Sequence, residues 1–346
     1  MHPEIEKRLA RWDEFFDLKS DVRRVLIVRG CQQPGEVPPA ASFSMHWPEN
    51  AWVQADWALR HYADQMRRLD WLADDSIPHV SLLSGTEIIA ECFGCPVTRP
   101  QTNMPYARYA VHNAQEAANL KKPNLMDTPL RLQFEKADYI KKHEPDALIR
   151  MPDLQSPLDI AAMVWDKNDF YCAVSEEPEA VHDLCEKCFG LLCDFLDEWF
   201  SRYGTDYVAH FPDYPMHGGL TISEDEIGII SNDLFEEFAL PYLNRLSERY
   251  GGIGVHSCAN SRHQWPLIKK IKGLKLLNLI QPGPVIEESI PYFETVTAQM
   301  PEFSYRNLNR SEFERAHVVA VYGAGQITRE QMSDEIARLR SGFPGW

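Results

Sequence analysis

The chain has 346 residues, 44% of them hydrophobic, which is enough for one large domain or two ordinary ones and argues against a disordered chain. Its 51 acidic and 35 basic side chains give a formal net charge of −16, which would repel a nucleic-acid backbone. The N-terminus, MHPEIEKRLARWDEFFDLKSD, lacks the apolar core of a secretion signal, and no window approaches the length of a membrane span, so we expect a cytoplasmic protein without a membrane partner.

Short apolar runs alternate with amphipathic stretches along the chain. An N-terminal helix is predicted within residues 1–20. Strand-like runs follow at 25–29, 79–83, 147–151, 207–211, 220–223, 252–256, 274–280 and 318–322. Helical stretches are predicted at 51–72, 158–164, 178–203, 233–250, 261–271 and 329–339. This alternation is typical of a parallel sheet wrapped by crossover helices, and eight such units favour a closed (β/α)8 barrel.

No linker, internal repeat or low-complexity tract divides the chain. No glycine-rich dinucleotide fingerprint or phosphate loop follows any predicted strand, which disfavours a Rossmann-type fold. We therefore predict one α/β domain over 1–346, a (β/α)8 TIM barrel with an N-terminal helical extension. The Pro-rich segment within 30–50 is predicted to form an active-site loop after the first strand.

The eight cysteines do not describe a disulfide framework, because a cytosolic setting keeps thiols reduced. Cys185, Cys188 and Cys193 fall on the apolar face of the helix predicted over 178–203. Cys92 and Cys95 form a C-x-x-C, a spacing used for metals and redox pairs. Without a second C-x-x-C, packing in the core is the favoured interpretation of that pair.

Polar residues follow many of the predicted strands, and in a parallel barrel these positions form the active-site face. They are Arg29, Asp153, Gln155, His210, Asp213, His217, Glu224, Asp225, His256, Cys258, Gln281 and Tyr322. His46 and Trp47 could cover the site from the 30–50 loop. Each residue taken singly could be a turn residue, a helix cap or a hydrogen-bonded core residue. A ring of acids and imidazoles at one end of a barrel is costly to desolvate without a ligand, so their convergence favours a site.

His256 and Cys258 suggest metal chemistry. Alternation along a strand places residues two apart on the same face, and zinc prefers imidazole and thiolate ligands. A single ion could therefore contact both side chains. The structural alternative is a hydrogen-bonded histidine beside a cysteine that acts as a small apolar residue.

Three segments carry a resemblance to a known family. The segment ISEDEIGIISNDLFEEFALPYLNRLSERYGGIGVHSCANSRHQWPLIKKIKGLKLLNLIQPG resembles the second half of the uroporphyrinogen decarboxylase superfamily. Upstream, DSIPHVSLLSGTEIIAECFGCPV and IRMPDLQSPLDIAAMVW resemble the decarboxylase-like proteins of anaerobes, in the branch closer to corrinoid methyltransferases. The likeness runs from about residue 50 to 340 and implies a (β/α)8 barrel with its pocket at the carboxyl ends of the strands.

Two chemistries occur in that superfamily. True uroporphyrinogen decarboxylases work without metal and bind the substrate's carboxylates through an R-Q-A-G-R motif. This chain lacks the motif, and Arg29 is the only basic residue in a comparable place, which disfavours haem synthesis. The methyltransferase branch binds zinc through His-x-Cys and a later cysteine, and the metal activates a thiol that accepts a methyl group from a methylcorrinoid protein.

The resemblance implies that His256 and Cys258 are zinc ligands. No cysteine follows position 258, so the third ligand would have to be Glu224, Asp225, His46, His263 or Tyr322. We therefore predict a zinc-dependent methyltransferase that acts on a small molecule with a corrinoid-protein partner, and a homodimer is one assembly open to it. The predicted catalytic residues are Asp225, Glu224 and Asp153, and the predicted substrate-binding residues are His46, Trp47, Gln155, His210, His217 and Tyr322.

Two alternatives stay open. A metal-free decarboxylase would use Asp225 or Asp153 to stabilise a protonated intermediate as carbon dioxide leaves. A barrel without catalysis would only bind a corrinoid or tetrapyrrole, and the missing last cysteine is the feature that favours it.

Overall fold

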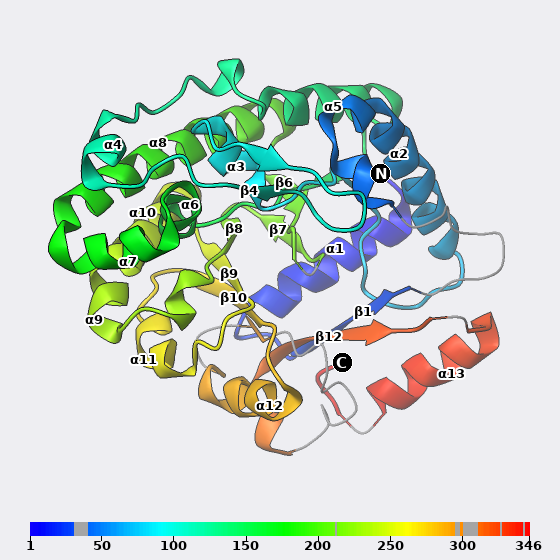
Figure 1. Ribbon diagram of the computed structural model, residues 1–346. Coiled ribbons are helices and arrows are strands. Elements are labelled where there is room, and N and C mark those ends of the chain that lie inside the picture. The colour runs from blue at the N-terminus through cyan, green and yellow to red at the C-terminus, as the bar shows by residue number, and fades with distance from the viewer. Residues whose placement is uncertain (31–40, 212, 295–297, 300–310, 326, 342) are drawn as a thin grey trace.

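The computed structural model describes residues 1–346 except 31–40, 212, 295–297, 300–310, 326 and 342 (Figure 1). The part of the predicted active-site loop at 31–40 therefore lies outside the described residues. The strands are β1 (Arg24–Arg29), β2 (His79–Ser81), β3 (Val97–Thr98), β4 (Tyr106–Ala107), β5 (Leu148–Arg150), β6 (Asp206–Val208), β7 (Pro215–His217), β8 (Leu220–Ser223), β9 (Ile253–Ser257), β10 (Leu274–Leu279), β11 (Ala298–Gln299) and β12 (His317–Gly323).

The α-helices surround these strands (Figure 1). They are α1 (Pro3–Phe16), α2 (Ala51–Arg68), α3 (Glu87–Cys92), α4 (Ala114–Asn119), α5 (Arg131–His143), α6 (Pro157–Val164), α7 (Lys167–Glu176), α8 (Pro178–Tyr203), α9 (Asn232–Leu234), α10 (Leu240–Tyr250), α11 (Trp265–Ile268), α12 (Gly283–Tyr292) and α13 (Arg329–Arg340). The predicted N-terminal helix is confirmed as α1. In the described part of the chain, each helix is too short or too polar to cross a lipid bilayer.

The helix predicted over 233–250 forms in three pieces. A single π-helical turn, Phe235–Ala239, separates α9 from α10. Pro241 lies in the first turn of α10, where a residue without a backbone N–H interrupts the hydrogen-bond ladder of the preceding turn. The apolar face continues through the interruption, because Phe235, Phe238 and Leu243 are all buried.

Most strands run parallel, in two sheets. The first sheet has the order β1-β12-β11-β10-β9-β8, and the second has the order β2-β5-β6-β7, in which only β7 is antiparallel to its neighbour. A parallel bridge between Gln155 and Ser223 places the segment after β5 beside the end of β8. The predicted α/β class is confirmed, although the described strands form these two sheets and a small antiparallel pair, β3 with β4, rather than one continuous ring.

Carboxylate side chains link the edge of the first sheet, at β1, to the segment before β2, at the edge of the second sheet. The side chains of Asp74 and Asp75 accept hydrogen bonds from the backbone N–H groups of Val28 at 3.0 Å and Leu26 at 2.8 Å. No strand pairing joins β1 to β2 among the residues that the structure describes. At this seam between β1 and β2, the carboxylates of Asp74 and Asp75 therefore accept the backbone N–H groups that a paired strand would otherwise bind. Space for a cavity remains between the two strands.

Alternation along β1 and β12 separates two packed layers. Val25 and Ile27 face the interior core, whereas Leu26 and Val28 pack into a second cluster with residues of α13. Along β12, Val319 and Val321 belong to the interior, and Val318 and Ala320 belong to the outer cluster. This alternation decides which side chains near the carboxyl ends of β1 and β12 point toward the interior of the protein.

The seven cysteines of the described residues are free thiols. Burial raises the pKa of Cys92 and of Cys95 to about 11, so both remain protonated at neutral pH. Cys185 and Cys188 are fully buried in α8. The burial of these thiols agrees with core packing as the role of both cysteine groups.

Candidate metal and substrate site

His256 and Cys258 lie together at the carboxyl end of β9. The Nε2 atom of His256 is 3.2 Å from the Sγ atom of Cys258, so the two side chains share one face of the strand. His256 is half-buried, with its ring 4.5 Å from the ring of Phe211, and Cys258 is exposed. The pair therefore stands at the boundary between the interior and solvent.

The neighbouring strand β10 fixes the orientation of the His256 ring. The Nδ1 atom of His256 is hydrogen-bonded to the Oδ1 atom of Asn278 in β10. Because an amide oxygen only accepts, Nδ1 carries the hydrogen and the Nε2 lone pair faces Cys258. Burial lowers the pKa of His256, which favours the neutral ring that a metal ligand requires.

Asp225 supports the pair from the loop after β8. Its Oδ1 atom accepts hydrogen bonds from the Cys258 N–H at 2.6 Å and from the Ser257 hydroxyl at 3.2 Å. The carboxylate thus holds the backbone turn that presents the thiol. The structure brings Asp225 to the predicted site and gives it a positioning contact there.

Asp159 of α6 completes this support, although sequence reasoning did not select it. Its carboxylate accepts the backbone N–H groups of Asp225 at 2.8 Å and Glu226 at 2.9 Å. Burial raises the pKa of Asp159 to about 7, and the nearby charges of Asp225 and Glu226 act in the same direction. The only sequence signal was its place three residues after Ser156, whose side chain accepts the Asp159 N–H as a helix cap.

Glu224 does not reach the site, which corrects its predicted role as a catalytic residue or metal ligand. Its side chain is 0% exposed and lies near Asp159 and Ser156 without well-formed hydrogen bonds to them. Burial, together with the adjacent Asp159, raises the pKa of Glu224 well above its usual value. The side chains of Ser223 and Asp225 point toward the candidate site, where they contact Asp153 and Ser257. Because neighbouring side chains alternate in extended backbone, Glu224 points the opposite way, into the core.

Asp153 and His210 form a second polar pair beside the first. The Oδ2 atom of Asp153 is 3.1 Å from His210 Nε2, and its Oδ1 atom accepts hydrogen bonds from Gln155 at 2.8 Å and Ser223 at 3.1 Å. Burial alone would raise the pKa of Asp153, but His210, His256 and the hydroxyl of Ser223 together outweigh burial and hold this pKa below its usual value. Asp153 is therefore an ionised, well-anchored carboxylate.

An open cavity of about 310 Å³ adjoins this second pair. Its lining includes His46, Ser84, Arg150, Asp153 and His210. A much smaller space connects Asp153 and His210 with His256. His256 of the first pair thus lies next to Asp153 and His210 of the second pair at the carboxyl ends of the strands.

His46 and Trp47 lie over a neighbouring cavity of about 230 Å³, which Lys136 of α5 also lines. His46 borders this cavity as well as the larger one, whereas Trp47 borders only this one. Burial and the charge of Lys136 lower the pKa of His46. The structure places His46 at the candidate substrate pocket and Trp47 at the neighbouring cavity.

His217 and Tyr322 lie elsewhere, which corrects two predicted substrate contacts. His217 ends β7, which turns back along β6, so it pairs with Asp206 at the start of β6 and with Asp13 of α1. It therefore sits at the amino ends of the strands. Tyr322 packs against the outer cluster with α13, as the parity of β12 requires, and faces away from the interior.

A third protein ligand beside His256 and Cys258 is not evident. Across the described ranges, no group of three or more His, Cys, Asp or Glu side chains is placed to hold a metal ion. Of the predicted substitutes, Asp225 already contacts the Cys258 turn, and His263 lies within 3.1 Å of the Ile230 carbonyl oxygen. The candidate donor set among the described residues therefore consists of His256 and Cys258, with Asp225 as a supporting carboxylate.

The comparisons with known proteins agree with this architecture. A sequence model of the uroporphyrinogen decarboxylase (URO-D) family matches residues 77–279, a segment that contains both polar pairs. No curated protein matches the chain. Among solved structures, a methyltransferase from Methanosarcina mazei superimposes with a TM-score of 0.64 and 13% sequence identity, covering 95% of this chain and 97% of that one. At this identity, the likeness concerns the fold.

Proposed function

This chain belongs to the uroporphyrinogen decarboxylase family, and we propose that it is a zinc-dependent methyltransferase that transfers a methyl group from a methylcorrinoid protein to a small-molecule thiol. The proposal includes the (β/α)8 barrel of that family. The observation that carries it is the 3.2 Å separation of His256 Nε2 and Cys258 Sγ at the solvent boundary of the pocket. The similarity of the fold to that of the methyltransferase from Methanosarcina mazei also supports the proposal.

The two side chains fit a zinc ion. Tetrahedral zinc, with bonds of about 2.0 Å to nitrogen and about 2.3 Å to sulfur, holds such atoms roughly 3.5 Å apart. The observed 3.2 Å separation is close to this value, and the Nε2 lone pair already faces the sulfur. Bound zinc would keep the sulfur of a substrate thiol in its nucleophilic thiolate form at neutral pH.

The surrounding residues have separate tasks in this proposal. Asn278 fixes the His256 tautomer, and Asp225 holds the turn that carries Cys258. The ionised Asp153, with His210 and Gln155, would bind a polar group of the substrate in the adjoining cavity of about 310 Å³. Because Cys258 is exposed, a large protein-bound methyl donor can approach from solvent.

Cobalt substitution tests the metal site. The protein, purified without an affinity tag and loaded with Co²⁺, should show thiolate-to-cobalt absorption that disappears in Cys258→Ser and weakens in His256→Ala. Cys172→Ser is the matched control, because Cys172 is also an exposed free thiol but lies on α7. Loss of methylcobalamin in the presence of a panel of thiols would then measure the transfer. Cobalt spectra that are unchanged in Cys258→Ser would overturn the proposal.

A metal-free decarboxylase is the second candidate. The observation that favours it is Asp153, a half-buried carboxylate whose pKa His210 helps to hold low, which could stabilise positive charge as carbon dioxide leaves. A chelator distinguishes the two functions, since it should abolish methyl transfer and leave decarboxylation unchanged. Tight corrinoid binding without turnover on any thiol would instead indicate a binding protein.

A further inference from the structure

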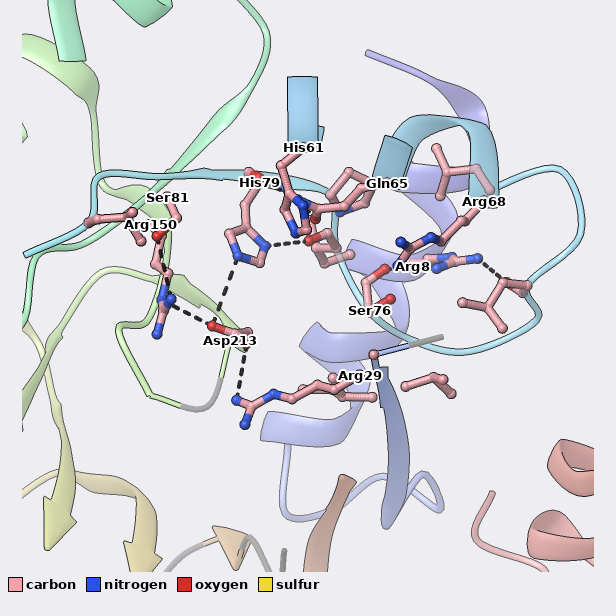
Figure 2. A pocket seen from close by; sticks show the side chains of 18 of the residues that line it. Arg8, Arg29, His61, Gln65, Arg68, Ser76, His79, Ser81, Arg150 and Asp213 are labelled. Carbon is pink, nitrogen blue, oxygen red and sulfur yellow. Dashed lines mark hydrogen bonds and ion pairs between the residues drawn. The ribbon is translucent and has the colours of Figure 1, made fainter. Parts of the chain in front are cut away.

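A separate cavity of about 250 Å³ lies at the seam between β1 and β2 (Figure 2). β1 contributes Arg29 and two apolar residues, and α2 contributes Trp57, His61 and Arg68. The cavity exists because carboxylate side chains, rather than a backbone ladder, join β1 to the segment before β2. It meets the candidate substrate pocket at Arg150, which lines both spaces.

The lining of this seam cavity is strongly basic in a chain of net charge −16. Four arginines line it, and the only acid among the lining residues is Asp213. The arginines are Arg8, Arg29, Arg68 and Arg150. A concentration of one charge sign in a partly enclosed space attracts counter-ions of the opposite sign.

Three of these arginines already have acidic partners. Arg8 pairs with Asp74 at 2.7 Å. Both Arg29 and Arg150 contact the Asp213 carboxylate at 3.0 Å, as Figure 2 shows. Asp213 has a φ of 79°, the one left-handed backbone conformation at a non-glycine among the described residues. Its placement shows that this wall of the cavity accommodates a carboxylate.

Arg68 and His61 differ from that group. The Nε atom of Arg68 and the Nδ1 atom of His61 are buried and have no hydrogen-bond partner among the described residues. The His61 ring stacks on Trp57 at 5.1 Å, which holds it in place. Burial, followed by the charges of His79 and Arg68, lowers the pKa of His61 to about 4, against the opposing charge of Asp213.

We propose that the seam cavity binds a small molecule through a carboxylate or phosphate group, with Arg68 and His61 as the direct donors. Arg29 and Arg150 add positive charge from the opposite side. The apolar wall formed by Trp57, Leu69 and Ile77 receives the body of the ligand. The inference does not depend on methyl transfer, because it involves neither His256 nor Cys258.

Calorimetry on the full-length protein at constant ionic strength tests this site, with sulfate, orthophosphate and succinate as probes and urea as a neutral control. The wild type should bind at least one of the anions with saturation. Arg68→Gln should weaken that binding by about tenfold or more, as loss of a charge-assisted hydrogen bond does. Tighter binding of succinate would identify a carboxylate ligand, and tighter binding of the tetrahedral anions would identify a phosphate ligand.

Arg67→Gln is the matched control, because Arg67 is the neighbouring residue on α2, is exposed and pairs with Asp64. It should bind the anions as the wild type does. His61→Gln, which removes the other donor, should also weaken binding, and urea unfolding of each variant excludes a loss of fold. Absence of saturable binding to all three anions, or equal weakening in Arg67→Gln and Arg68→Gln, would overturn the proposal.

Discussion

Replacement of Lys136 by methionine should make the protein more stable at neutral pH and should remove a rise in stability that the wild type shows above pH 7. Lys136 is 3% exposed, and its ammonium group donates to Gln54 Oε1 at 2.5 Å. Within the described residues it has no acidic partner. Burial therefore lowers the pKa of Lys136 from 10.5 to about 7.

The sign and size follow from proton linkage. Between about pH 7 and 10.5 the unfolded chain keeps a proton on this lysine that the folded protein has lost, so stability rises with pH in this interval. The slope reaches about 1.4 kcal/mol per pH unit, and because the folded lysine is still half protonated at pH 7, the gain between pH 7 and 9 is about 2 kcal/mol. Below pH 7 the full penalty remains, on the order of 5 kcal/mol.

Urea unfolding at pH 6, 7, 8 and 9 measures this effect. The difference in unfolding free energy between Lys136→Met and the wild type should be largest at pH 6 and should shrink towards pH 9. The hydrogen bonds lost with the ammonium group lower the variant's stability equally at each pH, so the pH dependence isolates the charge. Lys142→Met is the control, because Lys142 is exposed on the same helix. Parallel curves for wild type and Lys136→Met would refute the reasoning.

Three further predictions concern the site and the seam. Asp225→Asn should weaken Co²⁺ binding by about 10- to 100-fold, because it loosens the turn that presents Cys258, and titration followed by thiolate-to-cobalt absorption checks this. Arg8→Met should destabilise the fold by about 3–5 kcal/mol, because it leaves Asp74 buried without its partner at the junction of β1 and β2; urea unfolding measures the loss. Asp153→Asn should raise KM for the small-molecule substrate while metal content stays constant, and a loss of bound metal in this variant would contradict the separation of the two polar pairs.

Much of the site could be predicted because it depends on local spacing. Strand alternation places His256 and Cys258 on one face, and the ends of parallel strands gather at one edge, which brings Asp153 and His210 near them. The same local rule fails for Tyr322, because spacing gives the period of β12 but not which of its faces meets α13. His217 was misplaced because no sequence signal revealed that β7 turns back beside β6.

The sequence by itself determined the α/β class, the family and the pairing of an imidazole with a thiol, since each rests on periodicity or on neighbouring residues. Tertiary structure alone decided which distant groups meet them. Asp159 reaches the loop after β8 from α6, and Arg68 and His61 reach the seam from α2, through contacts between residues far apart in the chain. Such contacts depend on how helices pack against the sheets, and the identity of a residue carries no record of the partner that packing will bring to it.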